Sequence, residues 1–479
     1  MSTDRRVFEL TTLLRQTIEA LGKGSPALAE EARELFEMVS RPPRVAVVGR
    51  LKSGKSTLVN ALTENKIAAT DALECTMTVS IYRNGAPARA EVRGHHGQVE
   101  RIPLSDGPLT QLPMPLNEVD YIDQYLPNAR LERLTLIDTP GTATLTVENE
   151  ARTKRVLVEG RKDTTRASSW ADSVVFLSDS TPREDELELL SQLGMTPLTT
   201  VGVLSRADSF GAGAFGHNDP LDHARSHASR IASELGGAVY TVLPLSGLMA
   251  ESALTGRVNT AVARDLATLS ELDRDQVLDV LELEDPREAG VALSAEQRDG
   301  LLDILGEYGF LAGRRIAAER GAAGLVEWMT EVSGLAQLTE ILIGELSYYA
   351  VLQRAVRVLD ILQDLANNHP DREHVRWVHS VITTQPAMHY VVLYRSYRDT
   401  YATNPSSSLL PFLRQAIAAD TPAQVVGLSP DTPTEEVRAV LQQEIQQLHN
   451  LAMSSLSAAE DEARERLVAA CQSALEALH

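Results

Sequence analysis

The sequence has few of the residues and runs that mark secreted or membrane-spanning proteins. Two cysteines, Cys75 and Cys471, are too few for a disulfide framework, so we expect a reducing compartment. The first residues, MSTDRRVFEL, lack the apolar core of a signal peptide. No run approaches the roughly 20 apolar residues that span a bilayer. These absences predict a cytoplasmic location and leave open a peripheral contact with the inner face of the plasma membrane.

Positive charge and aromatic side chains are also scarce. The net charge is -21 and the pI is about 5.0, which argues against a nucleic-acid partner held by charge. No lysine follows Lys162, so the later chain has no polylysine segment for anionic lipid. Aromatic residues make up 4% of the chain. This composition is typical of a helical protein whose interior is filled by Leu, Ala and Val.

The length of 479 residues exceeds what one core usually holds, so we expect several modules. Residues 5–39 show apolar residues at helical spacing, with a break predicted at Gly22, Gly24 and Pro26. We expect an N-terminal neck helix in 1–43, a nucleotide-binding domain in 44–346 with a helical insertion at about 250–332, and a helical neck or trunk in 347–479.

Strand and helix signals alternate through the central domain, which predicts an α/β fold with a mixed, mostly parallel sheet and helices on both faces. A hairpin turn is predicted at 94–97, where His95 and His96 are expected to be exposed rather than metal-bound. The expected strands are 44–48, 77–83, 88–93, 98–103, 133–138, 174–178, 199–204 and 240–244.

A phosphate-binding loop joins the first strand to a helix. Residues 49–56, Gly-Arg-Leu-Lys-Ser-Gly-Lys-Ser, fit G-x-x-x-x-G-K-[ST] without a mismatch. Loop N–H groups and the helix N-terminus face the phosphates, the Lys55 ammonium reaches the β- and γ-phosphates, and the Ser56 hydroxyl can ligate Mg²⁺. The predicted phosphate site consists of Gly49, Lys52, Ser53, Gly54, Lys55, Ser56 and Thr57.

A second motif, Asp138-Thr139-Pro140-Gly141, follows the strand 133–138. In this D-x-x-G pattern the Asp138 carboxylate holds a Mg²⁺-bound water and the Gly141 N–H meets the γ-phosphate, so loss of that phosphate releases the segment. A threonine from switch I must also reach Mg²⁺. Thr70, Thr76 and Thr78 qualify by position, and Thr76 lies where the geometry needs it, with a surface threonine as the alternative.

The choice of base depends on Ser205-Arg206-Ala207-Asp208, which departs from [NT]-K-x-D at its first two positions. A carboxylate at Asp208 accepts hydrogen bonds from guanine N1–H and the 2-amino group, donors that adenine lacks. Arg206 can stack its guanidinium on the base plane. Ser246-Gly247 follows a strand and resembles the loop that touches guanine through its backbone. We therefore expect GTP or GDP with Mg²⁺ as the ligands.

These motifs resemble those of the bacterial dynamin-like proteins, in particular the shorter of the paired isoniazid-inducible actinobacterial members. The likeness is carried by the loop through Leu62, by Glu74-Cys75-Thr76 before a strand, by Ala171-Asp172 before another, and by Ser333-Gly334-Leu335. The resemblance implies a neck formed by 5–39 and 434–478. It also implies weak nucleotide binding, hydrolysis on head-to-head dimerisation, membrane remodelling, and a homodimer or a hetero-oligomer with a longer paralogue.

One departure from the family pattern affects the catalytic assignment. Thr142 follows Gly141 where related GTPases place a glutamine that orients water, so completion of the site by a dimer is expected. Some dynamins hold a monovalent cation near the loop, and we hypothesise that the Lys52 ammonium replaces it. A solvated loop lysine is the alternative. With this hypothesis the predicted catalytic residues are Lys55, Thr76 and Lys52, and the metal ligands are Ser56, Thr76 and Asp138.

Two further stretches have alternative interpretations. Residues 390–398, Tyr-Val-Val-Leu-Tyr-Arg-Ser-Tyr-Arg, suit a membrane interface, but a core helix with outward arginines is favoured. The basic cluster from Arg152 to Arg166 suits either a dimer interface or a solvated helix. Two other functions stay open: a soluble regulatory GTPase, which the missing basic accessory domain opposes, and a scaffold that binds nucleotide with little turnover.

Overall fold

The computed structural model describes residues 3–50, 52–67, 78–95, 97–104, 109, 111–139, 171–181, 195–235, 237–452 and 457–478. They form two compact units. One combines the chain up to Arg41, residues 171–172 and the chain from Gly344 onward, and the other contains the remaining described residues between Pro42 and Ile343. The divisions fall next to the boundaries expected after residues 43 and 346.

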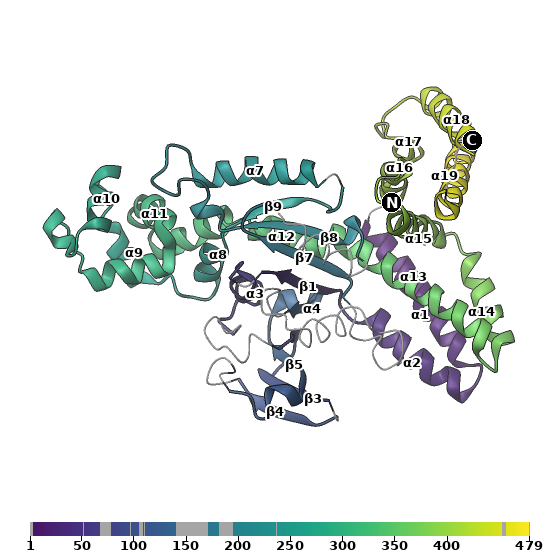
Figure 1. Cartoon of the computed structure of the whole chain (residues 1–479), viewed down its shortest axis with the longest axis horizontal. Helices are drawn as coiled ribbons and strands as arrows, with labels where there is room; N and C mark the ends of the chain where they lie inside the picture. The colour runs from purple at the N-terminus through teal and green to yellow at the C-terminus, as the bar shows by residue number, and fades with distance from the viewer. Residues whose placement is uncertain are drawn as a thin grey trace. The chain divides into compact units, whose positions relative to one another are not determined.

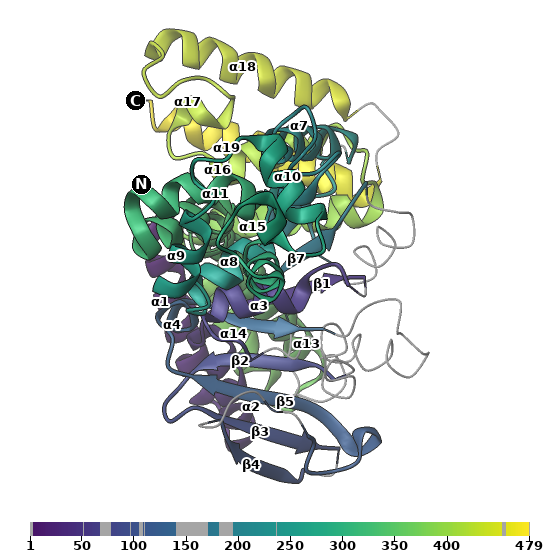
Figure 2. The same cartoon turned by 90° about the vertical axis from the view of Figure 1, so that its left-hand side faces the viewer.

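The second unit is built on one sheet in the order β4-β3-β5-β2-β6-β1-β7-β8-β9. Figure 2 shows these strands stacked from β4 and β3 through β5 and β2 toward β1 and β7. β3 and β4 form the predicted antiparallel hairpin. The strand bounds are β1 Arg44–Gly49, β2 Ser80–Asn84, β3 Arg89–Gly94, β4 Val99–Pro103, β5 Val119–Leu126, β6 Thr135–Asp138, β7 Ser173–Ser178, β8 Thr200–Ser205 and β9 Val242–Leu245.

Five neighbouring strands of this sheet, β6, β1, β7, β8 and β9, run parallel to one another. β1 is apolar along its whole length except at its ends, and all of its residues are buried, as expected for a strand covered on both faces. Parallel strands place their carboxyl ends at one edge, so the loops that follow these strands are brought together.

The strand β5 was not predicted from the sequence. It pairs parallel with β2 and antiparallel with β3. Its sequence, Val-Asp-Tyr-Ile-Asp-Gln-Tyr-Leu, places the polar Asp123 at a position that is 2% exposed. Arg83 and Arg93 each donate to that carboxylate at 2.8 Å. Ion pairs with neighbouring strands therefore allow a buried polar residue inside β5. As a result, the sequence of β5 does not show the alternation of apolar and polar residues by which a strand is recognised.

Helices α3, α4, α7, α8 and α12 surround the sheet, and α9 to α11 form the predicted insertion (Figure 1). α7 covers β8 and β9 through a cluster that includes Leu204, Ala228 and Val242. The bounds are α3 Lys55–Thr63, α4 Ala129–Arg133, α7 Pro220–Glu234, α8 Gly247–Leu254, α9 Thr260–Ala267, α10 Arg274–Glu282, α11 Ala295–Val332 and α12 Leu335–Ile343. Short 3-10 turns are η2 Leu116–Glu118, η5 Pro197–Thr199, η6 Ala207–Ser209 and η7 Pro286–Ala289.

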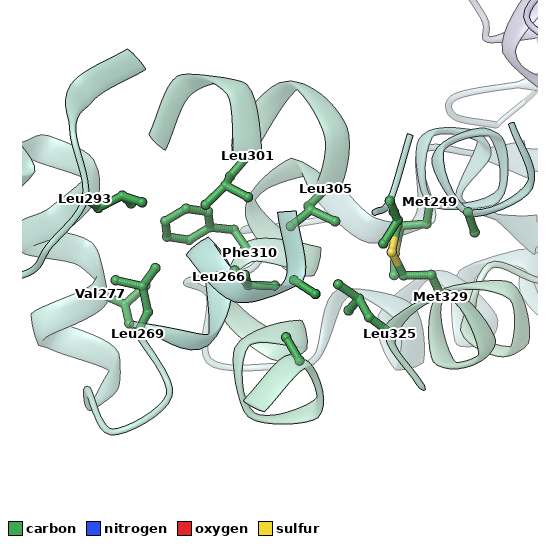
Figure 3. Packing of buried hydrophobic residues seen from close by; sticks show 14 of the residues in the cluster. Met249, Leu266, Leu269, Val277, Leu293, Leu301, Leu305, Phe310, Leu325 and Met329 are labelled. Atoms are coloured by element: carbon green, nitrogen blue, oxygen red, sulfur yellow. The ribbon is translucent and has the colours of Figure 1, made fainter. Parts of the chain in front are cut away.

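The insertion has its own apolar core. Figure 3 shows Leu266 of α9 and Leu301, Leu305 and Phe310 of α11 directed into this cluster. Leu305 and Phe310 have no solvent exposure. The insertion is thus a packed helical layer, and it contacts the rest of the domain where α11 packs on α8 and on the turn η6.

The other unit is helical, and α13 lies at its centre. Residues from Tyr348 to Leu359 of this helix are all buried, so neighbouring helices surround it. The bounds are α1 Thr3–Gly22, α2 Pro26–Ser40, α13 Glu345–Asn368, α14 Arg372–Thr383, α15 Met388–Thr403, α16 Leu409–Ala418, α17 Pro422–Val425, α18 Thr434–Leu451 and α19 Ala458–Glu476.

The N-terminal segment is divided at the break that was predicted at Gly22, Gly24 and Pro26. It forms the pair α1 and α2, because α1 ends at Gly22 and α2 begins after Ser25, whose side chain accepts from the Leu28 N–H. Among the described residues α1 packs mainly on α2, α13 and α14, whereas α19 packs mainly on α15, α16, α17 and α18. The pairing of 5–39 with 434–478 is therefore not the main contact of the N-terminal segment. The helix α13 packs on α1 instead.

The stretch 390–398 lies in α15 as an interior helix, which is the favoured interpretation. Val391, Leu393 and Tyr394 are buried. Arg395 and Arg398 point their guanidinium groups to Asp360, at 2.9 and 2.8 Å. Separately, no described helix is long and apolar enough to cross a membrane.

A buried ion pair connects distant segments of the helical unit. Asp172 has no solvent exposure, and its carboxylate accepts from Arg354 at 2.6 Å and from Arg357 at 3.1 Å. Arg354 also donates to the Arg41 carbonyl at 2.7 Å. Burial alone would raise the pKa of Asp172, but Arg354 and Arg357 outweigh it and lower this pKa to about 2.

We expect Asp172→Ala to lower the free energy of unfolding by about 3–5 kcal/mol, because two arginines are left buried without their carboxylate. Asp360→Ala, which removes a partly exposed carboxylate with two arginine partners, should cost at most about 1 kcal/mol. Urea unfolding measures both. The Asp172 contribution is present above the ordinary pKa of 3.8 and is lost as pH falls through about 2. Equal losses in the two variants would contradict this prediction.

Candidate nucleotide site

The predicted motifs lie at the carboxyl ends of neighbouring parallel strands. β1 ends at Gly49 and leads into the phosphate loop, β6 ends at Asp138, and β8 ends at Ser205. In the sheet, Val47 of β1 is in register with Asp138. The Thr139 hydroxyl donates to the Val47 carbonyl at 2.8 Å, which fixes the start of the D-x-x-G segment beside β1. The strand order brings together motifs that lie far apart in the sequence.

The phosphate loop has the backbone conformation that its glycines permit. Gly54 adopts φ +95° directly before α3. A Cβ atom built on Gly49 would lie 2.5 Å from the Leu177 carbonyl oxygen, so no larger residue fits there. Ser53 is buried, and its Oγ atom has no hydrogen-bond partner among the described residues. A phosphate oxygen is a suitable partner for this hydroxyl, and the start of α3 supplies N–H groups for the same anion.

Lys55 is enclosed within this loop. Its ammonium donates to the carbonyls of Gly49 at 3.0 Å and Arg50 at 2.8 Å. Burial lowers the pKa of Lys55, while the charge of Asp138 acts in the opposite direction. The ammonium is therefore held by weak neutral acceptors, which a phosphate group can replace with a charge-assisted bond.

Asp138 has an enclosed carboxylate oxygen without a partner. Among the described residues, no group donates a hydrogen bond to its Oδ1 atom. Burial raises the pKa of Asp138 to about 6, although the Lys55 charge and a backbone hydrogen bond from Thr139 lower it. An unpaired buried oxygen beside a phosphate loop fits a ligand for Mg²⁺ or for a Mg²⁺-bound water.

The donor set matches Mg²⁺ bound together with a nucleotide. The described residues contain no group of three or more His, Cys, Asp or Glu that could hold a metal unaided. Mg²⁺ is commonly held by one or two protein oxygens together with substrate phosphates. Ser56 and Asp138 supply such oxygens on α3 and β6, which are in contact. The other expected residues, Thr76 and Gly141, lie outside the described part of the chain.

The base end of the site begins after β8. Ser205 is buried, and its hydroxyl donates to the Ser178 carbonyl at 3.3 Å. Arg206 adopts φ +57°, and its guanidinium donates to the Lys52 carbonyl at 2.8 Å. This contact ties the base loop to the phosphate loop, a role different from the stacking that the sequence suggested. The Lys52 side chain itself is exposed.

The loop after β9 is held by two hydrogen bonds of Ser246. The Ser246 side chain caps α8 by accepting from the Met249 N–H, and its own N–H donates to the Ser333 carbonyl at 2.9 Å. A Cβ built on Gly247 would approach Thr57 to 3.3 Å, so this loop lies against the phosphate-loop helix. Gly247 and Thr57, two of the predicted site residues, are thus brought together.

A buried polar pair that sequence reasoning missed joins α3 to α8. The Asn60 side chain donates to Glu251 at 2.7 Å and accepts from the Ile67 N–H at 2.9 Å. Asn60 is fully buried and Glu251 is 4% exposed. The contact connects the phosphate-loop helix with the helix of the base loop. A single polar residue inside the apolar run 58–62 was the available signal, but its partner is distant in sequence.

Together these features define a GTPase domain of the P-loop class, with a mixed, mostly parallel sheet and helices on both faces. The predicted fold class is confirmed. Residues 44–202 match the family described as 50S ribosome-binding GTPase.

Similar proteins support the resemblance stated from the motifs. The isoniazid-induced protein IniC of Mycobacterium tuberculosis (strain CDC 1551 / Oshkosh) is 33% identical over 327 residues, which is 64% of this chain and 64% of that protein. The chain thus spans less than two thirds of the length of this relative. The translation initiation factor IF-2 of Synechococcus sp. (strain CC9902) is 26% identical over 50% of this chain and 16% of its own length. The resemblance to the isoniazid-inducible actinobacterial proteins is confirmed.

A solved structure from an oligomerised bacterial dynamin pair, described in connection with long-range sensing and tethering of membranes, is also similar. Its TM-score is 0.35 at 14% identity, covering 99% of this chain and 74% of that chain. A likeness of this size says nothing about what the present chain binds.

We expect Asp138→Asn to stabilise the nucleotide-free protein at pH 8 while weakening Mg²⁺-dependent nucleotide binding. A folded-state pKa raised from 3.8 to about 6 means that stability is fully present below 3.8 and is lost as pH rises through about 6. The amide mimics the protonated form, so the unfolding temperature should rise by about 2 °C or more at pH 8. It should change little at pH 4.

Calorimetry at both pH values, without nucleotide or Mg²⁺, measures this effect. Asp179→Asn, which changes an exposed carboxylate just after β7, is the control and should have little effect at either pH. A lower unfolding temperature for Asp138→Asn at pH 8 would contradict the buried-charge argument.

Proposed function

We propose that this protein is a dynamin-like GTPase that binds GTP with Mg²⁺ and hydrolyses it when its heads dimerise. The observation that carries the proposal is the order of groups along one sheet edge. Asp138 ends β6, the phosphate loop follows β1 in the neighbouring position, and Asp208 follows β8 further along. This order matches the order of metal, phosphates and base in a nucleoside triphosphate that is bound with Mg²⁺.

The chain's own residues bind and orient the nucleotide. Lys55 and the N-terminus of α3 face the phosphates, Ser56 and Asp138 hold the metal, and Asp208 accepts from the base. Mg²⁺, when bound, neutralises charge that develops on the phosphates. Thr142 stands where related enzymes carry glutamine, so orientation of the attacking water must come from another part of the assembly. A second head is the simplest source, which makes turnover dependent on association.

Membrane remodelling or maintenance, at the inner face of the plasma membrane, is the cellular role that the resemblance favours. In this proposal the chain acts as a homodimer or beside a longer dynamin-like paralogue that contacts the lipid. The strongly negative net charge gives this chain little electrostatic attraction of its own for anionic lipid. The proposal therefore assigns the lipid contact to the partner and assigns a second GTPase head to this protein.

A nucleotide-binding scaffold is the second candidate. Arg206 and Ser205 replace the usual residues of the base motif, and Arg206 is engaged with the Lys52 carbonyl. A base loop bonded to the phosphate loop can order the site without accelerating hydrolysis. This candidate predicts tight binding together with negligible turnover at every protein concentration.

We expect GTP turnover per molecule to rise with protein concentration, because association completes the site, and to exceed ATP turnover at each concentration. Phosphate release at rising concentration, alone and with the longer paralogue, measures this. Lys55→Ala, which removes the phosphate-binding ammonium, is the inactive control. Flat and negligible turnover despite GTP binding would favour the scaffold.

We further propose that the Lys52 ammonium takes the place of a monovalent cation beside the phosphates. Lys52→Ala should then lower turnover about tenfold or more, a loss of about 1.4 kcal/mol in transition-state stabilisation, and K⁺ should restore part of it. Lys23→Ala, which removes an exposed lysine from the helical unit, is the charge-matched control. Unchanged turnover without K⁺ dependence would assign Lys52 as a solvated loop residue.

A further inference from the structure

The long helix α11 is interrupted at two glycines. Gly306 has φ 65° and ψ 175°, and Gly321 has φ 63° and ψ -161°. These backbone angles are accessible almost only to glycine, and such strained positions gather at functional sites. The sequence alone does not mark these two positions, because α11 also contains Gly309 and Gly313, where the backbone stays helical.

The two breaks differ in what surrounds them. A Cβ atom built on Gly306 would lie 3.4 Å from Oδ2 of Asp208 and 3.3 Å from a methyl group of Leu248. A Cβ built on Gly321 would meet no atom within 4 Å. The first break therefore lies directly beside the carboxylate that is proposed to read the base. The second has the same kind of backbone in open space.

The break at Gly306 is held in place on both of its sides. Leu305 and Phe310 are fully buried in the core of the insertion, where Figure 3 shows both side chains directed into the cluster. Tyr308 donates to Asp219 at 3.0 Å, at the start of α7. Packing and hydrogen bonding thus fix the position of Gly306 relative to the loop after β8.

The Asp208 carboxylate is available to a ligand. The residue is 9% exposed, and within the described part of the chain its side chain makes no hydrogen bond or ion pair. A largely buried carboxylate without protein donors is costly unless a ligand provides them. Guanine offers two donors, N1–H and the 2-amino group, and each needs an unobstructed carboxylate oxygen.

We propose that Gly306 is a specificity-determining residue: its missing side chain keeps Oδ2 of Asp208 open to the 2-amino group of guanine, and the helical insertion forms the wall of the base pocket. This inference rests on the proposed function. A methyl group at position 306 would occupy space beside Oδ2, where the 2-amino group approaches. The loss should therefore fall on that one hydrogen bond rather than on phosphate binding.

The test compares GTP with ITP, which lacks the 2-amino group, by equilibrium binding to the full chain with Mg²⁺. Wild-type protein should bind GTP about tenfold or more tightly than ITP, since one hydrogen bond to a charged group is lost. Gly306→Ala should weaken GTP binding by about the same factor and ITP binding much less, so that the ratio falls toward one. Gly321→Ala carries the same backbone strain away from the site and should keep the wild-type ratio.

A second measurement needs no variant. If the wall at Gly306 faces the 2-amino edge, wild-type protein should bind N2-methyl-GTP about tenfold or more weakly than GTP, because the added methyl group meets that wall and displaces the hydrogen bond. Equal affinities for the two nucleotides would overturn the inference even if Gly306→Ala failed to fold.

Three results separate the inference from the proposed function. A GTP preference over ITP in wild type that persists in Gly306→Ala overturns the role of Gly306 alone. Equal weakening of both nucleotides in Gly306→Ala and Gly321→Ala assigns the effect to backbone strain and also overturns it. A wild-type ratio near one overturns the guanine assignment of Asp208, and the inference fails with it.

Discussion

The parallel alignment of β6, β1, β7, β8 and β9 is the constraint on which the site depends. Successive side chains of a strand point to opposite faces of the sheet, so a slip of one residue would turn Asp138 to the opposite face. The register of Val47 with Asp138, supported by the Thr139 hydrogen bond, prevents this slip. The buried, apolar character of β1 makes that register costly to change.

Three aspartates show how environment divides one chemical group among different tasks. Asp172 is fully paired with arginines, and its pKa is held at about 2, so it acts as a structural anion. Asp138 has an unpaired oxygen and a pKa raised to about 6, which suits a metal ligand. The Asp208 side chain makes no hydrogen bond or ion pair with the described residues and lies beside Gly306, which suits recognition of a ligand.

Local motifs could be predicted from the sequence because their residues act within one loop. The phosphate loop needs eight consecutive residues, and the break at Gly22, Gly24 and Pro26 needs only turn chemistry. The strand β5 was missed because the ion pairs of Asp123 involve two other strands.

The tertiary contacts of the site could not be predicted in the same way. Asn60 and Glu251 meet only through the packing of α3 on α8, and Gly306 reaches Asp208 only through the insertion. Likewise, the resemblance implied that the two chain ends pair with each other, whereas α1 packs on α2 and on the central helix α13. Residues whose roles depend on distant neighbours carry no local signal.

The helical unit draws its first two helices and its central helix from opposite parts of the chain. The apolar residues Leu10, Leu14 and Ile18 of α1 are buried in the finished unit, yet α13 begins only at Glu345. During synthesis at about 5–20 residues per second, the roughly 300 intervening residues take on the order of 15–60 s to appear. Over that interval α1 and α2 have only each other as cover, so the nascent chain should be a substrate for chaperones that bind exposed apolar helices.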